Sequence, residues 1–153
     1  MTMRENVHAT AVSLGGKGIL LRGPSGSGKS LLALSLLDRY AARDVEAVLV
    51  ADDRVDLRRE GDTILMSAPA TIAGLIELRG RGIVTKPHRD NVRLDLVVDL
   101  MPTLERMPET HDFRVELLGH IVARCPVPKV GVIGMEHQRL LIEEALGATV
   151  IGR

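Results

Sequence analysis

The chain has 153 residues, and its 20 Lys and Arg residues balance its 20 Asp and Glu residues. This length suits one domain with one buried core, and the balanced charge gives no argument for a nucleic-acid or membrane partner. The polar start lacks the apolar segment of a signal peptide, and no apolar run approaches the roughly 18 residues of a membrane span. We therefore expect a soluble, cytoplasmic protein, in which the single cysteine, Cys125, is a small core residue.

The first half of the chain predicts strands around one helix. Loose alternation followed by a Gly-Gly turn indicates two strands before a glycine-rich stretch. A helical pattern follows that stretch, and the next apolar run is typical of a strand buried on both faces. A Glu-Gly-Asp turn then joins two short strands in an exposed hairpin. The expected elements are strands at 7–14 and 17–22, a helix at 29–42, and strands at 46–51, 55–58 and 63–66.

The second half carries weaker signals. Residues 72–78 predict one or two helical turns that end at a Gly-Arg-Gly break, and the polar, basic segment 86–93 is expected to be mobile. Strands are expected at 83–84, 92–100, 113–118 and 120–124, and a helix at 135–146. That helix should turn Leu140, Leu141, Ala145 and Leu146 inward and stop at Gly147. The whole pattern predicts an α/β fold with a central sheet and few flanking helices.

One motif carries the clearest chemistry. It matches the pattern G-x-x-x-x-G-K-[ST] of a phosphate-binding P-loop, between an apolar run and a helical pattern. Glycines let successive backbone N–H groups turn toward an anion, and the helix N-terminus adds a partial positive charge. Lys29 is expected to reach the β- and γ-phosphates, and the Ser30 hydroxyl to bind Mg²⁺. The predicted nucleotide-binding residues are Gly23, Pro24, Ser25, Gly26, Ser27, Gly28, Lys29 and Ser30.

Asp52 and Asp53 end the apolar strand that follows the predicted helix. In P-loop enzymes this position faces the phosphates and neighbours the metal. One carboxylate there can orient Mg²⁺ while the other takes a proton from an acceptor hydroxyl. The alternative is a pair of turn or cap residues. The sequence leaves open which aspartate would be the base.

Three further sets of residues give weaker signals. Glu77 and Arg79, taken alone, are typical of a solvated charged pair near a helix end. A lone strand histidine such as His8 is usually structural. The basic residues after position 78 form either a solvated face or an anion-facing loop. They are Arg79, Arg81, Lys86, Arg89 and Arg93.

Four strips of the sequence resemble the catalytic domain of the HPr kinase/phosphorylase family. The last of them looks like the family signature and is far more specific than a P-loop. Because the match covers nearly the whole chain, the resemblance implies the short form of the family, in which residues 1–153 are one catalytic domain without the separate N-terminal domain. The strips are Val7-His8-Ala9-Thr10, residues 23–30, Val50-Ala51-Asp52-Asp53-Arg54-Val55 and Gly74-Leu75-Ile76-Glu77-Leu78-Arg79-Gly80-Arg81-Gly82-Ile83.

The resemblance implies roles for individual residues. Lys29 resembles the family's phosphate lysine, and Ser30 and Glu77 resemble its magnesium ligands. Asp53, with Asp52 beside it, resembles the residue that accepts the serine proton and returns it in the reverse reaction. His8 resembles the active-site histidine, and Arg106 the catalytic arginine. The signature strip adds Arg79, Gly80 and Gly82 to Glu77.

The implied activity is ATP- and Mg²⁺-dependent phosphorylation of a serine on the phosphocarrier protein HPr, which would make the enzyme a regulator of carbon metabolism and of the phosphotransferase system. In the reverse reaction inorganic phosphate attacks phosphoserine and releases pyrophosphate. The family also implies a hexamer and a nucleotide site resembling that of phosphoenolpyruvate carboxykinase. Two departures, the short segment 85–93 and the partial phosphorylase strip at 126–131, favour the kinase direction. A small-molecule kinase and a nucleotide-gated binding switch are the alternatives.

Overall fold

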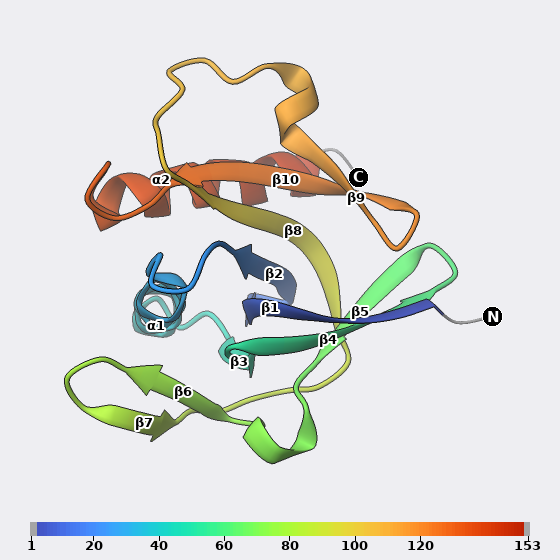
Figure 1. The fold of residues 1–153 in the computed structure, drawn as a ribbon, viewed down its shortest axis with the longest axis vertical. Helices are drawn as coiled ribbons and strands as arrows, with labels where there is room; N and C mark the ends of the chain where they lie inside the picture. The colour runs from blue at the N-terminus through green and yellow to red at the C-terminus, as the bar shows by residue number, and fades with distance from the viewer. Residues whose placement is uncertain (1–2, 152–153) are drawn as a thin grey trace.

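The computed structural model describes the backbone of residues 3–151 and the side chains of residues 3–148. This part of the chain forms ten strands, two α-helices and two short 3₁₀ turns (Figure 1). In chain order they are β1 (Met3–Leu14), β2 (Lys17–Arg22), α1 (Lys29–Ala42), β3 (Ala47–Ala51), β4 (Arg54–Glu60), β5 (Thr63–Ser67), η1 (Ala70–Ile72), β6 (Leu75–Leu78), β7 (Gly82–Thr85), β8 (Val92–Met101), η2 (Thr110–Phe113), β9 (Arg114–Leu117), β10 (His120–Pro128) and α2 (Met135–Ile151). The predicted α/β class, with a central sheet and few helices, is confirmed.

Five strands pair into a closed ring. The long strand β1 pairs with β4 through its first half and with β2 through its second half. Strand β5 links β4 to the start of β8, and β8 runs parallel to β2, which closes the ring. One apolar cluster takes side chains from all five strands. The ring therefore has its own core.

The predicted hairpin at 55–58 and 63–66 is present as β4 and β5, but it is not exposed. Val55, Leu57, Ile64 and Met66 are at most 1% exposed. These residues alternate along their strands, so one whole face of the hairpin points into the ring. The sequence showed the hairpin, and ring closure decided that it is half buried.

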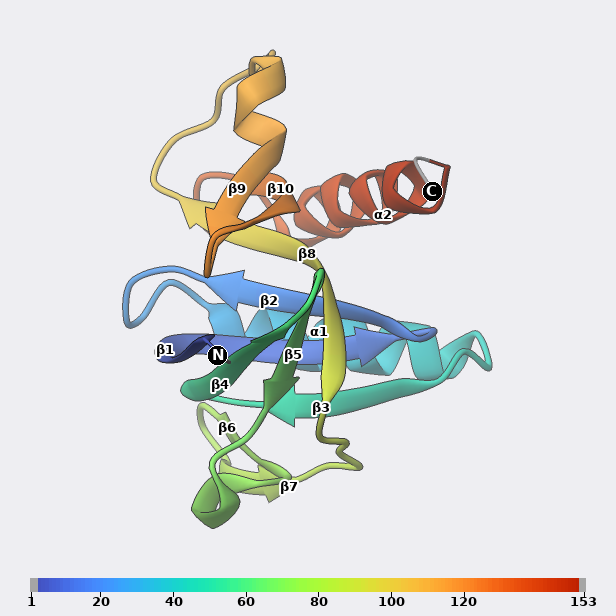
Figure 2. The same ribbon diagram turned by 90° about the vertical axis from the view of Figure 1, so that its right-hand side faces the viewer.

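A second apolar cluster lies between the outer face of the sheet and the two helices. Helix α1 packs against β1 and β3, and helix α2 against β10 and β8, as Figure 2 shows. Neighbouring residues of one strand serve both clusters, since Leu20 belongs to the ring core and Leu21 to the helical layer. The sheet continues from β8 through the parallel strand β10 to β9. Strands buried on both faces read as continuous apolar runs for this reason.

The helical turns predicted at 72–78 are wrong. A 3₁₀ turn covers only Ala70–Ile72, and Leu75–Leu78 forms strand β6, which pairs with β7 in a separate hairpin at the lower end of Figure 1. Gly74 lies between the 3₁₀ turn and β6 with a φ of 76°, a conformation that stops a helix. An added Cβ there would lie 2.6 Å from Nδ1 of His88.

The last helix also differs from its prediction. Helix α2 continues past Gly147 to Ile151 rather than stopping there. Among its residues up to position 148 the buried ones are Gln138, Ile142 and Leu146, each four positions from the next, whereas Leu140 is 51% exposed. The direction predicted for Leu140 is therefore wrong. No helix in the described part of the chain is long and apolar enough to cross a membrane.

The basic segment after β7 is tied to the edge of β3. The backbone of Leu49 bonds to Pro87 and Arg89, and the Arg89 guanidinium bonds to both carboxylate oxygens of Glu46 at 2.7 and 2.9 Å. These contacts argue against the mobility predicted for 86–93. For Arg89 they exclude an anion-facing role, because its guanidinium pairs with Glu46.

Candidate active site

The topology brings three segments to one edge of the sheet. Strand β1 lies between β2 and β3 and is antiparallel to both, so β2 and β3 end at the same edge. The glycine-rich loop (residues 23–30) follows β2, and Asp52 and Asp53 follow β3. The pairings Ala9 with Arg22 and Ala11 with Ala51 place the middle of β1 beside both strand ends. The edge thus gathers the loop, the two aspartates and residues 8–10.

The glycine-rich loop presents backbone N–H groups at the start of α1. Gly26 and Gly28 have φ values of 80° and 94°, which a residue with a side chain adopts only under strain. Gly28 is the N-cap of α1, no side chain caps the helix, and its first turn has no acidic residue. The first N–H groups of an uncapped helix need an outside acceptor. The loop therefore has the geometry of an anion site.

Lys29 folds back over the loop. Its Nζ donates to the carbonyls of Gly23 at 2.8 Å and Pro24 at 3.1 Å. Burial lowers the pKa of Lys29, against the attraction of Asp52 and Asp53. An ammonium has three N–H donors, and the described residues accept two of them. The remaining donor and the desolvated charge favour an anion above the loop.

Asp52 lies beneath the loop and is 8% exposed. Its Oδ1 accepts hydrogen bonds from the hydroxyls of Thr10 at 2.8 Å and Ser30 at 2.7 Å. Its Oδ2 accepts one from the backbone N–H of Glu77 at 3.3 Å. A carboxylate accepts hydrogen bonds only, so the Ser30 hydroxyl gives its hydrogen to Asp52 and keeps its lone pairs for a cation.

Asp53 has the opposite environment. Its side chain is 73% exposed, and its Oδ1 lies 3.1 Å from Nε2 of His8. Its φ of 71° turns the chain sharply after the strand, which points the two neighbouring carboxylates in different directions. One aspartate holds the loop, and the other stands in the open cavity beside a histidine.

These groups line one cavity of about 630 Å³. The hairpin of β6 and β7 forms the opposite wall, where Glu77 and Arg79 are 58% and 82% exposed at their side chains and 3.9 Å apart. Gly80 and Gly82, with φ values of 92° and 104°, build the turn of that hairpin. The cavity thus brings together ten of the sixteen predicted site residues: His8, Ser25, Gly26, Gly28, Lys29, Ser30, Asp52, Asp53, Glu77 and Arg79.

The oxygen atoms in this cavity suit a hard cation. Ser30, Asp52 and Glu77 offer hydroxyl and carboxylate oxygens, the ligand type that Mg²⁺ prefers. Among the described residues no three His, Cys, Asp or Glu side chains form a metal cluster. Mg²⁺ at nucleotide sites usually keeps one or two protein ligands beside phosphates and waters, so the residues present fit it.

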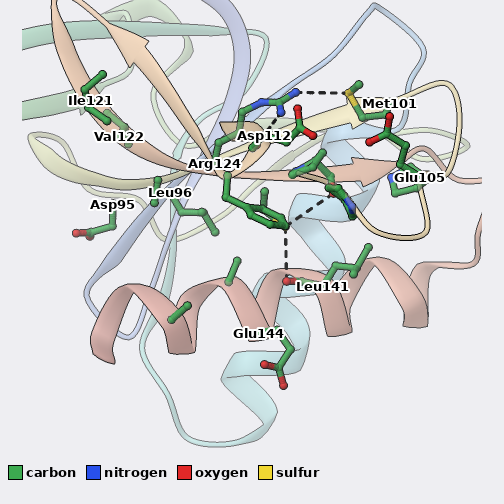
Figure 3. A pocket seen from close by; sticks show the side chains of 18 of the residues that line it. Asp95, Leu96, Met101, Glu105, Asp112, Ile121, Val122, Arg124, Leu141 and Glu144 are labelled. Carbon is green, nitrogen blue, oxygen red and sulfur yellow. Dashed lines mark hydrogen bonds between the residues drawn. The ribbon is translucent and has the colours of Figure 1, made fainter. Parts of the chain in front are cut away.

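Arg106 lies elsewhere. It lines a larger cavity of about 1060 Å³ between β10, α2 and the loop that follows β8 (Figure 3). There Arg124 donates to the Asp112 carbonyl at 2.9 Å, and burial raises the pKa of the Cys125 thiol to about 12. Arg106 is not among the residues that line the cavity beside the glycine-rich loop. Cys125 is a core residue, as predicted.

Two residues that lie in the site have no role predicted from the sequence. Thr10 is fully buried and bonds to Asp52, and Val130 Cγ1 lies within 3.5 Å of where a Cβ on Gly28 would be. Alternation along β1 puts Thr10 on the same side as His8, a signal that a period of two provides. Val130 belongs to the strip at 126–131, more than a hundred positions away along the chain, and no local pattern places that strip beside Gly28.

Comparisons with known proteins agree on one family. The family model described as "HPr Serine kinase C-terminal domain" matches residues 1–132. HPr kinase/phosphorylase of Caldicellulosiruptor bescii is 36% identical over 134 residues, which cover 79% of this chain and 41% of the relative. HPr kinase/phosphorylase of Lacticaseibacillus casei strain BL23 is 35% identical over 138 residues, which cover 84% of this chain and 41% of the relative.

A solved structure, the Hpr(Ser) kinase/phosphatase from Coxiella burnetii, matches with a TM-score of 0.75 and 26% identity over 97% of both chains. The present chain spans about two fifths of the length of the curated relatives it matches. The family match covers the strand–loop–helix unit, both aspartates and the β6–β7 hairpin. The chain therefore belongs to the HPr serine kinase C-terminal domain family.

Proposed function

We propose that this chain is one catalytic domain that transfers the γ-phosphoryl group of ATP to a serine of the protein HPr. The observation that carries the proposal is the division between the two aspartates. Asp52 is buried and bonded to Ser30 under the anion loop, while Asp53 is exposed beside His8 in the same cavity. A site that only senses a nucleotide needs the first arrangement and has no use for the second.

In the proposed reaction residues 23–30 act as a P-loop and hold the triphosphate. Their N–H groups and Lys29 neutralise phosphate oxygens, and neutralised oxygens repel the incoming nucleophile less. The site would resemble the nucleotide site of phosphoenolpyruvate carboxykinase. Ser30 and Glu77, with Asp52 behind them, would hold Mg²⁺, which would supply charge neutralisation at the phosphates.

Asp53 is the proposed general base. It accepts the proton of the serine hydroxyl as the serine oxygen forms its bond to the γ-phosphorus. The bond from that phosphorus to the bridging oxygen breaks, and ADP leaves with the bond's electrons. His8, 3.1 Å from the Asp53 carboxylate, orients it and shares its negative charge through a hydrogen bond.

A protein substrate suits the openness of this cavity. Asp53, Glu77 and Arg79 all have side chains that are more than half exposed, so an acceptor on a protein surface can reach them. A small-molecule kinase would need a lid, and the segment after β7 is pinned to β3 instead. The resemblance to the HPr kinase/phosphorylase family leads us to propose also that the protein is a hexamer, and that it acts in the cytoplasm on the phosphotransferase system.

Labelled ATP tests the kinase. Purified protein with Mg²⁺, γ-labelled ATP and HPr should place label on a serine of HPr. D53N should lower the transfer rate by about 10²–10⁴-fold, the usual contribution of a general base, while nucleotide affinity stays near that of the wild type. D38N, which neutralises an exposed aspartate on α1, is the matched control and should transfer normally.

Three outcomes would reject parts of the proposal. Normal transfer by D53N would remove Asp53 as the base and make Asp52 the candidate. Tight nucleotide binding without any labelled HPr would favour the nucleotide-gated switch. Label on a metabolite rather than on HPr would favour the small-molecule kinase.

The reverse reaction is a second candidate activity, and the names of the relatives favour it. Phosphate would attack phosphoserine and release pyrophosphate, with Asp53 returning the proton to the serine oxygen. The resemblance to the family's phosphorylase strip is only partial at 126–131, and there Val130 places an apolar side chain next to Gly28. Pyrophosphate formed from phosphorylated HPr and excess phosphate would establish this activity; its absence would confine the protein to the kinase direction.

A further inference from the structure

We propose that Thr10 is a positioning residue that decides which oxygen of Asp52 faces the bound cation. The inference rests on the proposed function, since it concerns the metal side of the same site. Thr10 lies in the middle of β1, is 0% exposed, and donates its hydroxyl hydrogen to Oδ1 of Asp52 at 2.8 Å.

The two oxygens of a carboxylate offer about four lone-pair sites for hydrogen bonds or cations. At Asp52 the hydroxyls of Thr10 and Ser30 take both sites of Oδ1, and the Glu77 N–H takes one site of Oδ2. The remaining site is on Oδ2. Asp52 can therefore meet a cation, or a water bound to one, through Oδ2 only.

Thr10 also fixes the hydroxyl of Ser30. Both hydroxyls bond to the same oxygen, so Oδ1 cannot rotate toward the cation without breaking two hydrogen bonds. Ser30 then keeps its hydrogen on Asp52 and its lone pairs toward the cavity. Hydrogen bonds behind a metal ligand typically change metal affinity by about 10- to 100-fold when they are removed.

The competing explanation is that Thr10 is a strand residue whose hydroxyl merely finds a partner. Threonine suits a strand, and a buried hydroxyl needs a hydrogen bond wherever it lies. Under this explanation, losing the hydroxyl changes stability and affects nucleotide binding equally with and without metal. Under the positioning role, only metal-dependent binding weakens.

The experiment uses T10V, which keeps the branched shape and removes the hydroxyl, and T10S, which keeps the hydroxyl. S13A removes a buried hydroxyl from the same strand, three positions away, and serves as the control. ADP binding to the full chain is measured by calorimetry with Mg²⁺ and again with EDTA. Mn²⁺ in place of Mg²⁺ gives a paramagnetic resonance spectrum of the bound cation as a second readout.

We expect T10V to weaken Mg²⁺–ADP binding by about 10-fold or more and to leave metal-free ADP binding within about twofold of the wild type. T10S should bind Mg²⁺–ADP nearly as tightly as the wild type, and S13A should not change this affinity. The Mn²⁺ spectrum should change in T10V alone. If T10V does not fold, T10A takes its place in the same titrations.

Equal Mg²⁺–ADP affinity in T10V and the wild type would overturn the role of Thr10 and leave the proposed function intact. Equal losses with and without metal would also overturn it, because they indicate a general disturbance of the loop. A wild-type chain that binds no Mg²⁺–ADP would overturn the proposed function and the role of Thr10 together.

Discussion

Two neighbouring aspartates at the end of β3 have opposite environments because of one backbone angle. Asp52 continues the strand into the core, where three donors surround it, and Asp53 turns into solvent with a φ of 71°. Asparagine and aspartate tolerate this left-handed region better than other residues with side chains. The division between a buried, hydrogen-bonded carboxylate and an open one is therefore built into the local chain geometry.

Gly18 shows how tightly single residues are fitted near the site. A Cβ there would lie 2.0 Å from the carbonyl oxygen of Arg93, across the pairing of β2 with β8. G18A should lower the free energy of unfolding by about 1–3 kcal/mol, because the two strands must move apart. Urea denaturation measures the loss.

The control for this substitution is G134A. Nothing lies within 4 Å of a Cβ at Gly134, and its φ is not among the positive values. G134A should change the unfolding free energy by less than about 0.5 kcal/mol. Equal effects of the two substitutions would mean that the close approach at Gly18 does not limit stability.

At the scale of elements, helix α2 packs against the sheet through one narrow row of buried side chains. Ile142 is 0% exposed and belongs to the core cluster between the helices and the sheet, whereas Leu140 is 51% exposed. I142A should cost about 2–5 kcal/mol, through lost burial and the cavity that remains. L140A should cost less than about 0.5 kcal/mol.

Thermal and urea unfolding of the two variants give the comparison. The Leu140 and Ile142 side chains are equal in size and lie on the same helix. The difference between their losses in unfolding free energy therefore reports which side chain points into the core. A larger loss from L140A than from I142A would reverse the assignment of the buried face and support the direction predicted from the sequence.

At the scale of the whole molecule, one ion-pair cluster joins three neighbouring strands. Asp99 of β8 accepts from Arg22 of β2 at 2.7 and 2.9 Å and from Arg124 of β10 at 2.5 Å. Burial raises the pKa of Asp99, but the hydrogen bonds and charges of the two arginines outweigh it and hold that pKa below its ordinary value. Arg22 directly precedes the glycine-rich loop, so the cluster also fixes where that loop begins.

The sign of the pH dependence follows from the lowered pKa. Stability from this cluster is present above the ordinary pKa of 3.8 and is lost as the pH falls through the lower value in the folded protein. D99N should cost about 3–5 kcal/mol at neutral pH, because it leaves two partly buried arginines without their partner. The difference in unfolding free energy between D99N and the wild type should become smaller in acid.

Urea unfolding at neutral pH and at about pH 3 checks both parts of this expectation. D38N is again a suitable control, since it removes an exposed carboxylate. A difference in unfolding free energy that stays constant with pH would show that the charge of the Asp99 carboxylate is not what stabilises the contact between the three strands.

The sequence by itself determined the strand–loop–helix unit, both aspartates, the last hairpin and the family. These depend on neighbours in the chain: glycines at fixed spacing, a lysine and a serine at a helix start, and alternating apolar residues. Tertiary structure decided the rest. It buried Asp52 and exposed Asp53, put Thr10 behind the carboxylate, closed the ring over β4 and β5, made β6 a strand and set Arg106 in another cavity. Each of these depends on contacts between segments far apart in the chain, and such contacts leave no local pattern because the partner's position is fixed only when the sheet closes.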